Sequence, residues 1–134
     1  MPMLLRTGIA IAACMLACGA TATAAVTLVD GGRPAAVVIL GADASPSEQW
    51  AAEELVNHVR QMSGATLEVV RAPTQVPERA VLLGESATTR ALGIAADASL
   101  GDEGFKLRTV GDRVVIVGGR KRGTMYGVYE LLER

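Results

Sequence analysis

The apolar residues of this chain recur at two spacings, one typical of helices and one typical of strands. The helical spacing of three and four positions is clearest in residues 45–64. One face of this segment carries the apolar side chains Ala51, Ala52, Leu55, Val56, Val59 and Met62. Ser45, Pro46 and Glu48 are suited to begin the helix with a capping box, and Gly64 is suited to end it.

Short β-type runs surround this helix. They occupy residues 26–29, 35–40, 66–70, 80–84, 105–110 and 113–117. The turn Asp30-Gly31-Gly32 predicts a hairpin between the first two runs, and Gly111-Asp112 predicts another between the last two. Apolar and polar residues alternate in 105–110, which indicates a half-exposed strand, whereas 80–84 is wholly apolar and is expected at the centre of a sheet.

Two further helices are expected nearer the C-terminus. Residues 87–92 follow Ser86, a possible cap, and stop at Gly93. Residues 123–134, GTMYGVYELLER, have Thr124 as a possible cap and an apolar face of Met125, Val128, Tyr129 and Leu132. Because the apolar pattern continues to the last residues without a stop signal, we expect the chain to be a fragment of a longer protein.

The element order is β-β-α-β-β-α-β-β-α, with the helix at 87–92 short. Hairpins imply antiparallel neighbours, and the strand-helix-strand passage allows a parallel pair. The expected fold class is therefore α/β (α+β): a two-layer sandwich in which a mixed β-sheet has its two main helices packed largely on one face.

Residues 1–24 have the order of a secretory signal peptide. A short basic start is followed by a small apolar stretch and by the cleavage pattern Ala22-Thr23-Ala24. We therefore expect export to the periplasm or the medium, and a single mature domain of residues 25–134. Both cysteines, Cys14 and Cys18, lie in the leader. The residues around them loosely resemble lipoprotein cleavage sites, so a lipid anchor is an alternative to soluble export.

The charge balance and the aromatic content exclude several kinds of partner. The whole chain has a formal net charge of −1, and loss of Arg6 with the leader brings it to about −2. Such a balance gives no sign of binding to nucleic acid or to anionic membranes, and no integral membrane span is expected. Aromatic residues make up 3% of the chain, which leaves few rings for stacking on sugars or bases.

No catalytic constellation is visible in the mature sequence. His58 is the only histidine and is expected to be structural, because one histidine without cysteines cannot by itself build a zinc site. Glu53-Glu54 and Asp102-Glu103 are adjacent carboxylates, whereas glycoside hydrolysis needs two carboxylates that face each other across a cleft. Solvated charge is the expected role of both pairs, and no cofactor or metal is expected.

Two other features allow both a functional and a structural interpretation. The segment 118–124, GGRKRGT, precedes a helix and carries three cations, which would suit an anion. It fails the P-loop pattern, so a solvated turn with Thr124 as cap is favoured. Trp50 could serve as a sugar platform, but a place in or beside the core is favoured.

Several sequence pieces, taken in order, resemble a known group of domains. They are AAEEL (51–55), MSGA (62–65), LLG (82–84), EGFKL (103–107), VIVGG (115–119) and RGTMYGVYELLE (122–133). Together they resemble the N-terminal accessory domain of bacterial exported glycoside hydrolases, a group that includes the N-terminal domain of α-glucuronidases and the second domain of β-N-acetylhexosaminidases. The signature residues, with an expected structural role, are Glu103, Gly104, Phe105, Gly123, Thr124, Tyr126, Gly127 and Tyr129.

The resemblance implies a non-catalytic domain that packs beside a (β/α)8 catalytic barrel in the same chain. The polysaccharide substrate would then be bound by the barrel, and no catalytic residue can be assigned within residues 25–134. Two alternatives remain open. One is a free-standing periplasmic module that binds a carbohydrate or a protein, through Trp50 or the Arg120-Lys121-Arg122 turn. The other is a small enzyme in its own right.

Overall fold

The computed structural model describes residues 26–134. The predicted signal peptide, its cleavage site and both cysteines lie outside the described residues. The elements in chain order are β1 (Val29–Asp30), β2 (Arg33–Pro34), β3 (Val37–Leu40), α1 (Pro46–Ser63), β4 (Val69–Arg71), β5 (Ala80–Leu83), α2 (Ala87–Ala91), the 3-10 turn η1 (Ala98–Leu100), β6 (Phe105–Val110), β7 (Arg113–Gly118) and α3 (Gly123–Leu132).

The main sheet has five strands in the order β4-β3-β5-β7-β6. The first four are parallel, with Val38 opposite Val69 and Val81, and Leu82 opposite Val115. Only β6 is antiparallel; it pairs with β7 along its whole length. The predicted mixed sheet is confirmed, and the carboxyl ends of four strands consequently meet at one edge.

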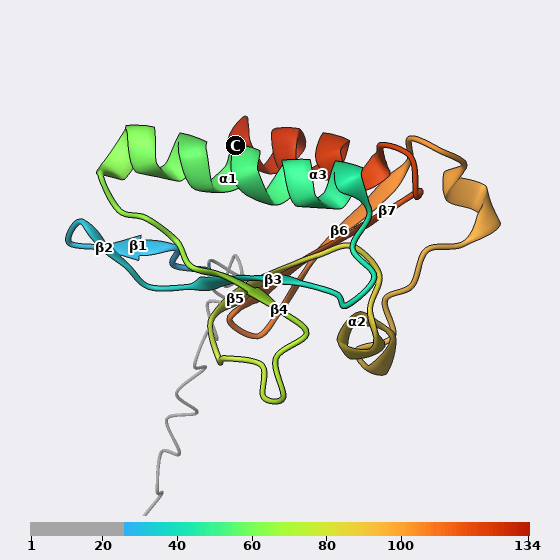
Figure 1. Cartoon of the computed structure of the whole chain (residues 1–134), viewed down its shortest axis with the longest axis horizontal. Coiled ribbons are helices and arrows are strands. Elements are labelled where there is room, and N and C mark those ends of the chain that lie inside the picture. Colours follow the sequence, from blue (N-terminus) through green and yellow to red (C-terminus); the bar gives the residue numbers. More distant parts are fainter. Residues whose placement is uncertain (1–25) are drawn as a thin grey trace, which may run out of the picture.

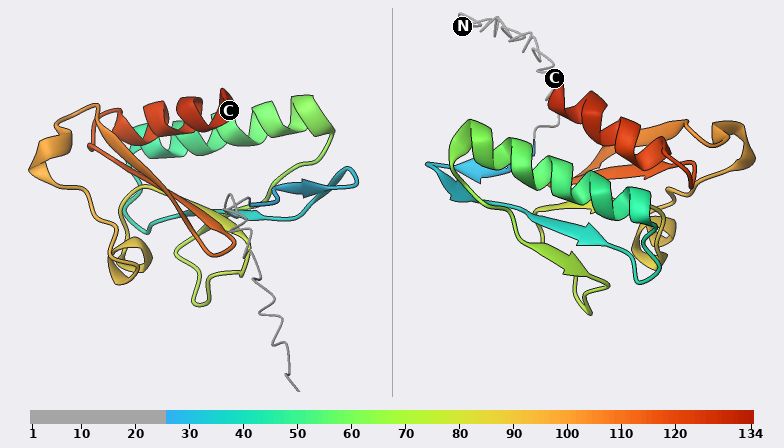
Figure 2. Two further views of the ribbon diagram at one scale, coloured as in Figure 1. Left: turned by 180° about the vertical axis from the view of Figure 1, so that it is seen from behind. Right: turned by 45° about the horizontal axis from the view of Figure 1, so that its top comes forward.

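The two long helices cover the same face of this sheet, as Figures 1 and 2 show. The layer between them and the strands is apolar and fully buried at its centre; its largest fully buried members are Leu55, Leu67, Leu83, Ile116, Val38, Val81 and Val128. Burial of such side chains is the dominant stabilising term in a small domain. The predicted two-layer arrangement, with both main helices on one face, is confirmed.

The opposite face of the sheet is also apolar, but loops and a short helix cover it. Alternate residues of the inner strands point to this side, including Ile39, Leu82 and Val115. They pack against residues from the loop after β4 and from the segment after α2, namely Val76, Leu92, Ile94 and Ala96. The inner strands are therefore buried on both faces, which explains their continuous apolar runs.

Helix α1 begins and ends where the sequence predicts. The Ser45 hydroxyl accepts from the Glu48 N–H, the Glu48 carboxylate accepts from the Ser45 N–H, and Gly64 adopts a φ of 77°. One residue of its predicted apolar face is placed wrongly: Met62 is 69% exposed. Periodicity identifies the face of a helix but not how far its covering extends.

The predicted hairpin between residues 26–29 and 35–40 is wrong. The turn at Asp30-Gly31-Gly32 exists, but it joins only β1 and β2, two residues each, with one further bond from the Ala35 N–H to the Leu28 carbonyl. Residues 37–40 instead form β3, an inner strand between β4 and β5. The strand predicted at 66–70 is shifted to Val69–Arg71, and η1 lies in a segment predicted as loop.

The predicted hairpin of β6 and β7 is confirmed, with Phe105 opposite Gly118 and Val110 opposite Arg113. The alternation along β6 does not produce alternating burial. Phe105, Lys106 and Leu107 are half-buried, whereas residues 108–110 are exposed. Exposure therefore increases toward the hairpin turn, because α3 lies over only the first part of this edge strand.

Candidate functional site

The signature residues come together at one joint of the fold, where β6 begins, β7 ends and α3 begins. Main-chain hydrogen bonds tie the three segments: the Gly119 N–H donates to the Gly104 carbonyl at 2.8 Å, and the Arg122 N–H donates to the Asp102 carbonyl at 2.9 Å. The two most specific sequence pieces, Glu103-Gly104-Phe105 and the segment from Gly123 to Tyr129, are thus neighbours in space.

Two glycines of the joint are required by close packing. A Cβ on Gly123 would collide with the Gly104 carbonyl oxygen. A Cβ on Gly127 would collide with the Ile116 side chain and lie 3.2 Å from the Phe105 ring. Helix α3 can approach the β6–β7 hairpin this closely only because both positions lack a side chain.

Thr124 does not cap α3, contrary to the prediction. The N-cap position is Arg122, which makes no side-chain capping bond, and Thr124 lies inside the first turn. The Thr124 side chain is 1% exposed, and its hydroxyl accepts a hydrogen bond from the Gly118 N–H at 3.2 Å. The hydroxyl therefore provides the hydrogen-bond acceptor for the last N–H of β7 and not for an N–H at the start of its own helix.

The exposed rim of the joint carries ion pairs. Lys121 Nζ lies 3.0 Å from an Asp102 carboxylate oxygen, and an Arg122 guanidinium nitrogen lies 3.9 Å from Glu103. A hydrogen bond with Tyr126 raises the pKa of the Arg122 guanidinium. The carboxylates of Asp102 and Glu103 thus pair with loop cations in water, in agreement with the expected solvated role.

A cleft of about 380 Å³ lies at the carboxyl ends of the parallel strands. Loops after all four contribute: Gly41–Asp43 after β3, Ala72–Pro73 after β4, Glu85–Thr88 after β5 and Arg120 after β7. In open α/β sheets this edge is where ligands bind, close to the point at which successive connections leave in opposite directions. Here β3 is that point, because β4 and β5 flank it on either side.

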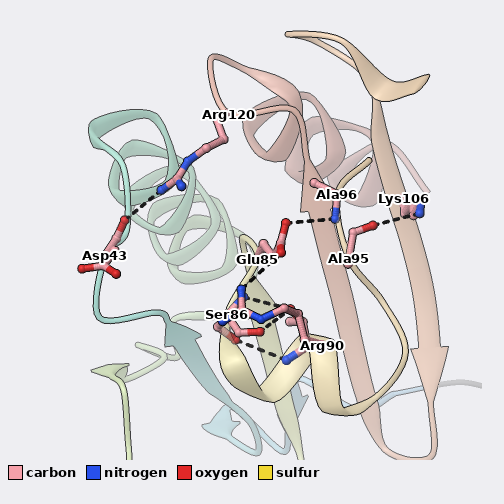
Figure 3. Close-up of polar contacts among 9 residues, drawn as sticks. Asp43, Glu85, Ser86, Arg90, Ala95, Ala96, Lys106 and Arg120 are labelled. Atoms are coloured by element: carbon pink, nitrogen blue, oxygen red, sulfur yellow. Dashed lines mark hydrogen bonds and ion pairs between the residues drawn. The ribbon is translucent and has the colours of Figure 1, made fainter. Parts of the chain in front are cut away.

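Most polar groups along one wall of the cleft are already paired (Figure 3). A Glu85 carboxylate oxygen lies 3.2 Å from the Arg90 guanidinium, and the other accepts from the Ala96 N–H at 3.1 Å. Ser86 and Thr89 form the reciprocal capping bonds of α2, as predicted for Ser86. Glu85 therefore fastens the segment after α2 to the end of β5.

Arg120 extends from the opposite wall. Its guanidinium donates to the main-chain carbonyl of Asp43 at 3.4 Å, so the contact links the loop after β7 to the loop after β3 (Figure 3). Asp43 contributes its carbonyl here and not its carboxylate. No residue in the range 26–134 forms an ion pair with Arg120.

A buried carboxyl group lies next to this cleft. Glu48 is 6% exposed, and its carboxyl packs so closely on Gly84 that a Cβ there would lie 2.5 Å from its carbon. Burial raises the pKa of Glu48, while the hydrogen bonds with Ser45 and the nearby Arg120 oppose that rise. The carboxyl group can stay buried because its oxygen accepts a hydrogen bond from the Ser45 N–H in the capping box.

The remaining candidate residues lie apart from both the joint and the cleft. His58 is half-exposed on α1, where its Nδ1 lies 2.8 Å from the Glu54 carbonyl. Trp50 is 52% exposed and is part of neither apolar cluster, so its expected place in or beside the core is wrong.

Across the described part of the chain, no three His, Cys, Asp or Glu side chains gather as a metal would require. No helix there has both the length and the apolar character of a membrane span.

Sequence reasoning missed most of the cleft. Of its lining, the sequence pattern identifies Arg120, as part of a cationic turn, and Ser86, as a helix cap. Asp43, Glu85 and Arg90 follow two strand ends, but they meet only once the strand order is known. The available signal was positional: Asp43 and Glu85 follow their strands, β3 and β5, within three residues.

Comparison with known proteins identifies the kind of domain. Residues 27–131 match the family described as the glycosyl hydrolase family 67 N-terminus. No curated protein matches the sequence.

Solved structures share the fold. One is a family GH115 4-O-methyl-α-glucuronidase with specificity for decorated arabinogalactans, at 21% identity and a TM-score of 0.59 over 78% of this chain and 14% of that chain. Another is a GH138 enzyme targeting pectin rhamnogalacturonan II, at 21% identity and a TM-score of 0.50 over 73% of this chain and 10% of that chain. The chain thus spans about a seventh of the first structure and a tenth of the second.

Proposed function

The chain belongs to the glycosyl hydrolase family 67 N-terminus family, and on that premise we propose that it is the non-catalytic accessory domain of an exported glycoside hydrolase. Domains of this family sit with a catalytic domain. We take that partner to be a (β/α)8 barrel in the same chain, which would bind the polysaccharide and carry the catalytic carboxylates.

Helix α3 is the observation that carries this proposal. Its first turns are locked into the domain, with Gly123, Thr124, Gly127 and Val128 buried. Tyr126, Tyr129, Leu131 and Leu132 are only half-buried. Leu131 and Leu132 pack in part against the core, and the remaining surface of the four side chains is open. A helix that is packed into its own domain and still leaves part of its apolar side chains open is suited to support a following domain.

The carboxylates of the domain also favour a supporting role. A glycosidase centre needs two carboxyl groups that flank the bond to be cleaved, roughly 5–10 Å apart across a cleft. Asp102 and Glu103 pair with Lys121 and Arg122 on the rim of the joint, and Glu85 pairs with Arg90. Each of these groups has a cation as its ion-pair partner. Burial raises the pKa of Glu48 and the nearby Glu85 adds to that rise, but the Glu48 carboxyl lies inside the fold, bonded to the Ser45 N–H in the capping box.

Export is the remaining part of the proposal. The order of residues 1–24 predicts cleavage after Ala24, which would give a mature chain that begins at Ala25. Mass spectrometry of the secreted protein distinguishes this product from a lipoprotein, whose first residue would be a lipid-modified Cys14 or Cys18. An uncleaved cytoplasmic product would contradict both.

The first test is the gene beyond codon 134. An open frame that encodes a barrel supports the proposal, and an immediate stop codon in a well-assembled gene contradicts it. In the two-domain protein we then expect Tyr126→Ala/Tyr129→Ala to separate one unfolding transition into two, because the domains lose their contact. Glu133→Ala, an exposed position next to the same helix, is the matched control and should leave one transition.

A free-standing binding module is the second candidate, and the exposure of Trp50 favours it. A half-exposed indole on the first turns of α1 is the kind of surface on which a sugar ring stacks. Isothermal titration of the purified chain with decorated arabinogalactan and pectin oligosaccharides tests it. Binding that Trp50→Ala abolishes would support this function, and flat titrations would exclude it for these glycans.

A further inference from the structure

The three cations of the loop between β7 and α3 do not share one role. Lys121 and Arg122 point to the carboxylates of Asp102 and Glu103 on the rim of the joint. Arg120 lies in the wall of the cleft, and its hydrogen bond within residues 26–134 is the long one of 3.4 Å to the Asp43 carbonyl. Arg120 also lies near enough to the buried Glu48 to oppose the rise that burial causes in the pKa of that carboxyl. Most of the five N–H donors of its guanidinium therefore have no protein acceptor among residues 26–134.

The loop that carries Arg120 is held in place. Its main chain bonds to the residue before β6 and to itself: the Gly119 N–H donates to the Gly104 carbonyl, and the Gly123 N–H donates to the Gly119 carbonyl at 3.0 Å. A Cβ on Gly119 would collide with the Gly101 carbonyl oxygen. The guanidinium is consequently attached to a fixed backbone, as a pre-organised ligand contact would require.

The carboxyl groups near Arg120 already have partners of their own, so an anionic ligand can bind beside Arg120. The carboxylate of Glu85 is neutralised by Arg90 and bonded to the Ala96 N–H. The Glu48 carboxyl, whose pKa burial raises, lies inside the fold and is bonded to the Ser45 N–H. The strand-end loops add main-chain groups of Gly41 and Ala42 and the hydroxyl of Thr88.

We propose that this cleft binds a monosaccharide-sized ligand that carries an oxyanion, a carboxylate or a phosphate, with Arg120 as the anchoring group. A guanidinium offers two parallel N–H donors to either oxyanion. The hydroxyl groups of the ligand face the loops after β3 and β5. A volume of about 380 Å³ is in the range of small-ligand sites and accommodates one sugar ring with its substituent. The inference does not depend on the proposed accessory role, because it concerns the strand-end edge and not α3.

Titration of the complete 15N-labelled chain, followed by NMR, tests the site. The probes are glucose 6-phosphate, gluconate and neutral glucose, each raised to millimolar concentration. We expect saturable shifts of the Gly41, Ala42 and Ser86 amides with one or both anions and none with glucose. Arg120→Gln should weaken that binding by about tenfold or more, the usual effect of losing a charged hydrogen-bond partner.

Lys121→Gln is the matched control, because Lys121 is the next residue of the same loop but pairs with Asp102 outside the cleft. It should leave the affinity within about twofold of the original. A response to glucose 6-phosphate alone identifies a phosphate site, and a response to gluconate alone identifies a carboxylate site. Absence of saturable shifts with both anions, equal binding of glucose, or equal losses in the two variants would overturn the proposal.

Discussion

The Thr124 hydroxyl of α3 accepts a hydrogen bond from the Gly118 N–H at the end of β7, and both groups are buried. The bond joins the last strand to the helix that follows it, inside the joint formed by the signature residues. A buried N–H without an acceptor is costly, so this one side chain decides whether the strand end is satisfied.

Thr124→Val tests this bond with almost no change in shape. Because the variant leaves the Gly118 N–H buried without an acceptor, we expect the free energy of unfolding to fall by about 1–3 kcal/mol. Urea denaturation measures the loss, and amide hydrogen exchange at Gly118 should become faster. Thr124→Ser keeps the acceptor and should keep slow exchange at Gly118. Equal exchange rates in the two variants would show that the bond does not protect the strand end.

Gly127→Ala sets helix propensity against packing. Alanine favours a helix over glycine by about 1 kcal/mol. The new Cβ would, however, collide with Ile116 and press on the Phe105 ring. We expect packing to prevail, with a net loss on the order of 1–2 kcal/mol in urea denaturation. Glu130→Ala, on the same helix, should change stability by less than about 0.5 kcal/mol. A stabilised Gly127→Ala variant would mean that α3 lies farther from the hairpin.

Glu48 predicts a pH dependence of stability. Because burial raises its pKa above the usual 4.5, the folded chain holds this proton more tightly than the unfolded chain does. Its contribution to the free energy of unfolding is therefore full below pH 4.5 and is lost as pH rises through the raised pKa. Glu48→Gln keeps an acceptor for the Ser45 N–H but cannot ionise. Urea denaturation at several pH values should show the variant gaining relative to the wild type across this window; a constant difference would refute it.

The exposed Asp97 should make stability depend on pH in the opposite sense to Glu48, because its pKa is lowered rather than raised. A hydrogen bond from Lys106, 2.9 Å from its carboxylate, and hydrogen bonds from Ser99 lower its pKa from 3.8 to about 2. Its stabilising contribution is present above pH 3.8 and is lost as pH falls toward 2. In Lys106→Met the pKa should return toward 3.8, which carboxyl NMR titration measures directly. Lys121→Met removes a cation that pairs with Asp102 and should leave the titration of Asp97 unchanged.

Local signals in the sequence were enough for the elements whose ends are fixed by nearby residues. The capping box of Ser45 and Glu48, the stop at Gly64 and the turn at Gly111 act within a few positions, and each was found where predicted. The same holds for the wholly apolar strand β5, since burial on both faces removes the polar alternation.

The errors arose where distant segments decide the outcome. Residues 37–40 follow a good turn, yet they pair with β4 and β5 because the sheet offers them two parallel neighbours. Thr124 follows the local pattern of a cap, but the close approach of Gly123 to Gly104 places it inside the helix, against β7. The cleft depended on strand order as a whole, and no short window of sequence contains that order.

Strand order also sets the timing of folding. The partners Val37 and Ala80, and then Ala80 and Arg113, are more than 30 positions apart in the chain. Until β7 has been synthesised, β5 has a neighbour on one side only, and its unpaired edge and apolar residues remain open to other chains. Molecules that lack β7 are therefore the aggregation-prone species, and the residues of β7 and β6 are the ones that close the sheet. A holdase that shields nascent or translocating chains should matter most in this interval, when nearly all of the core residues exist but cannot yet assemble.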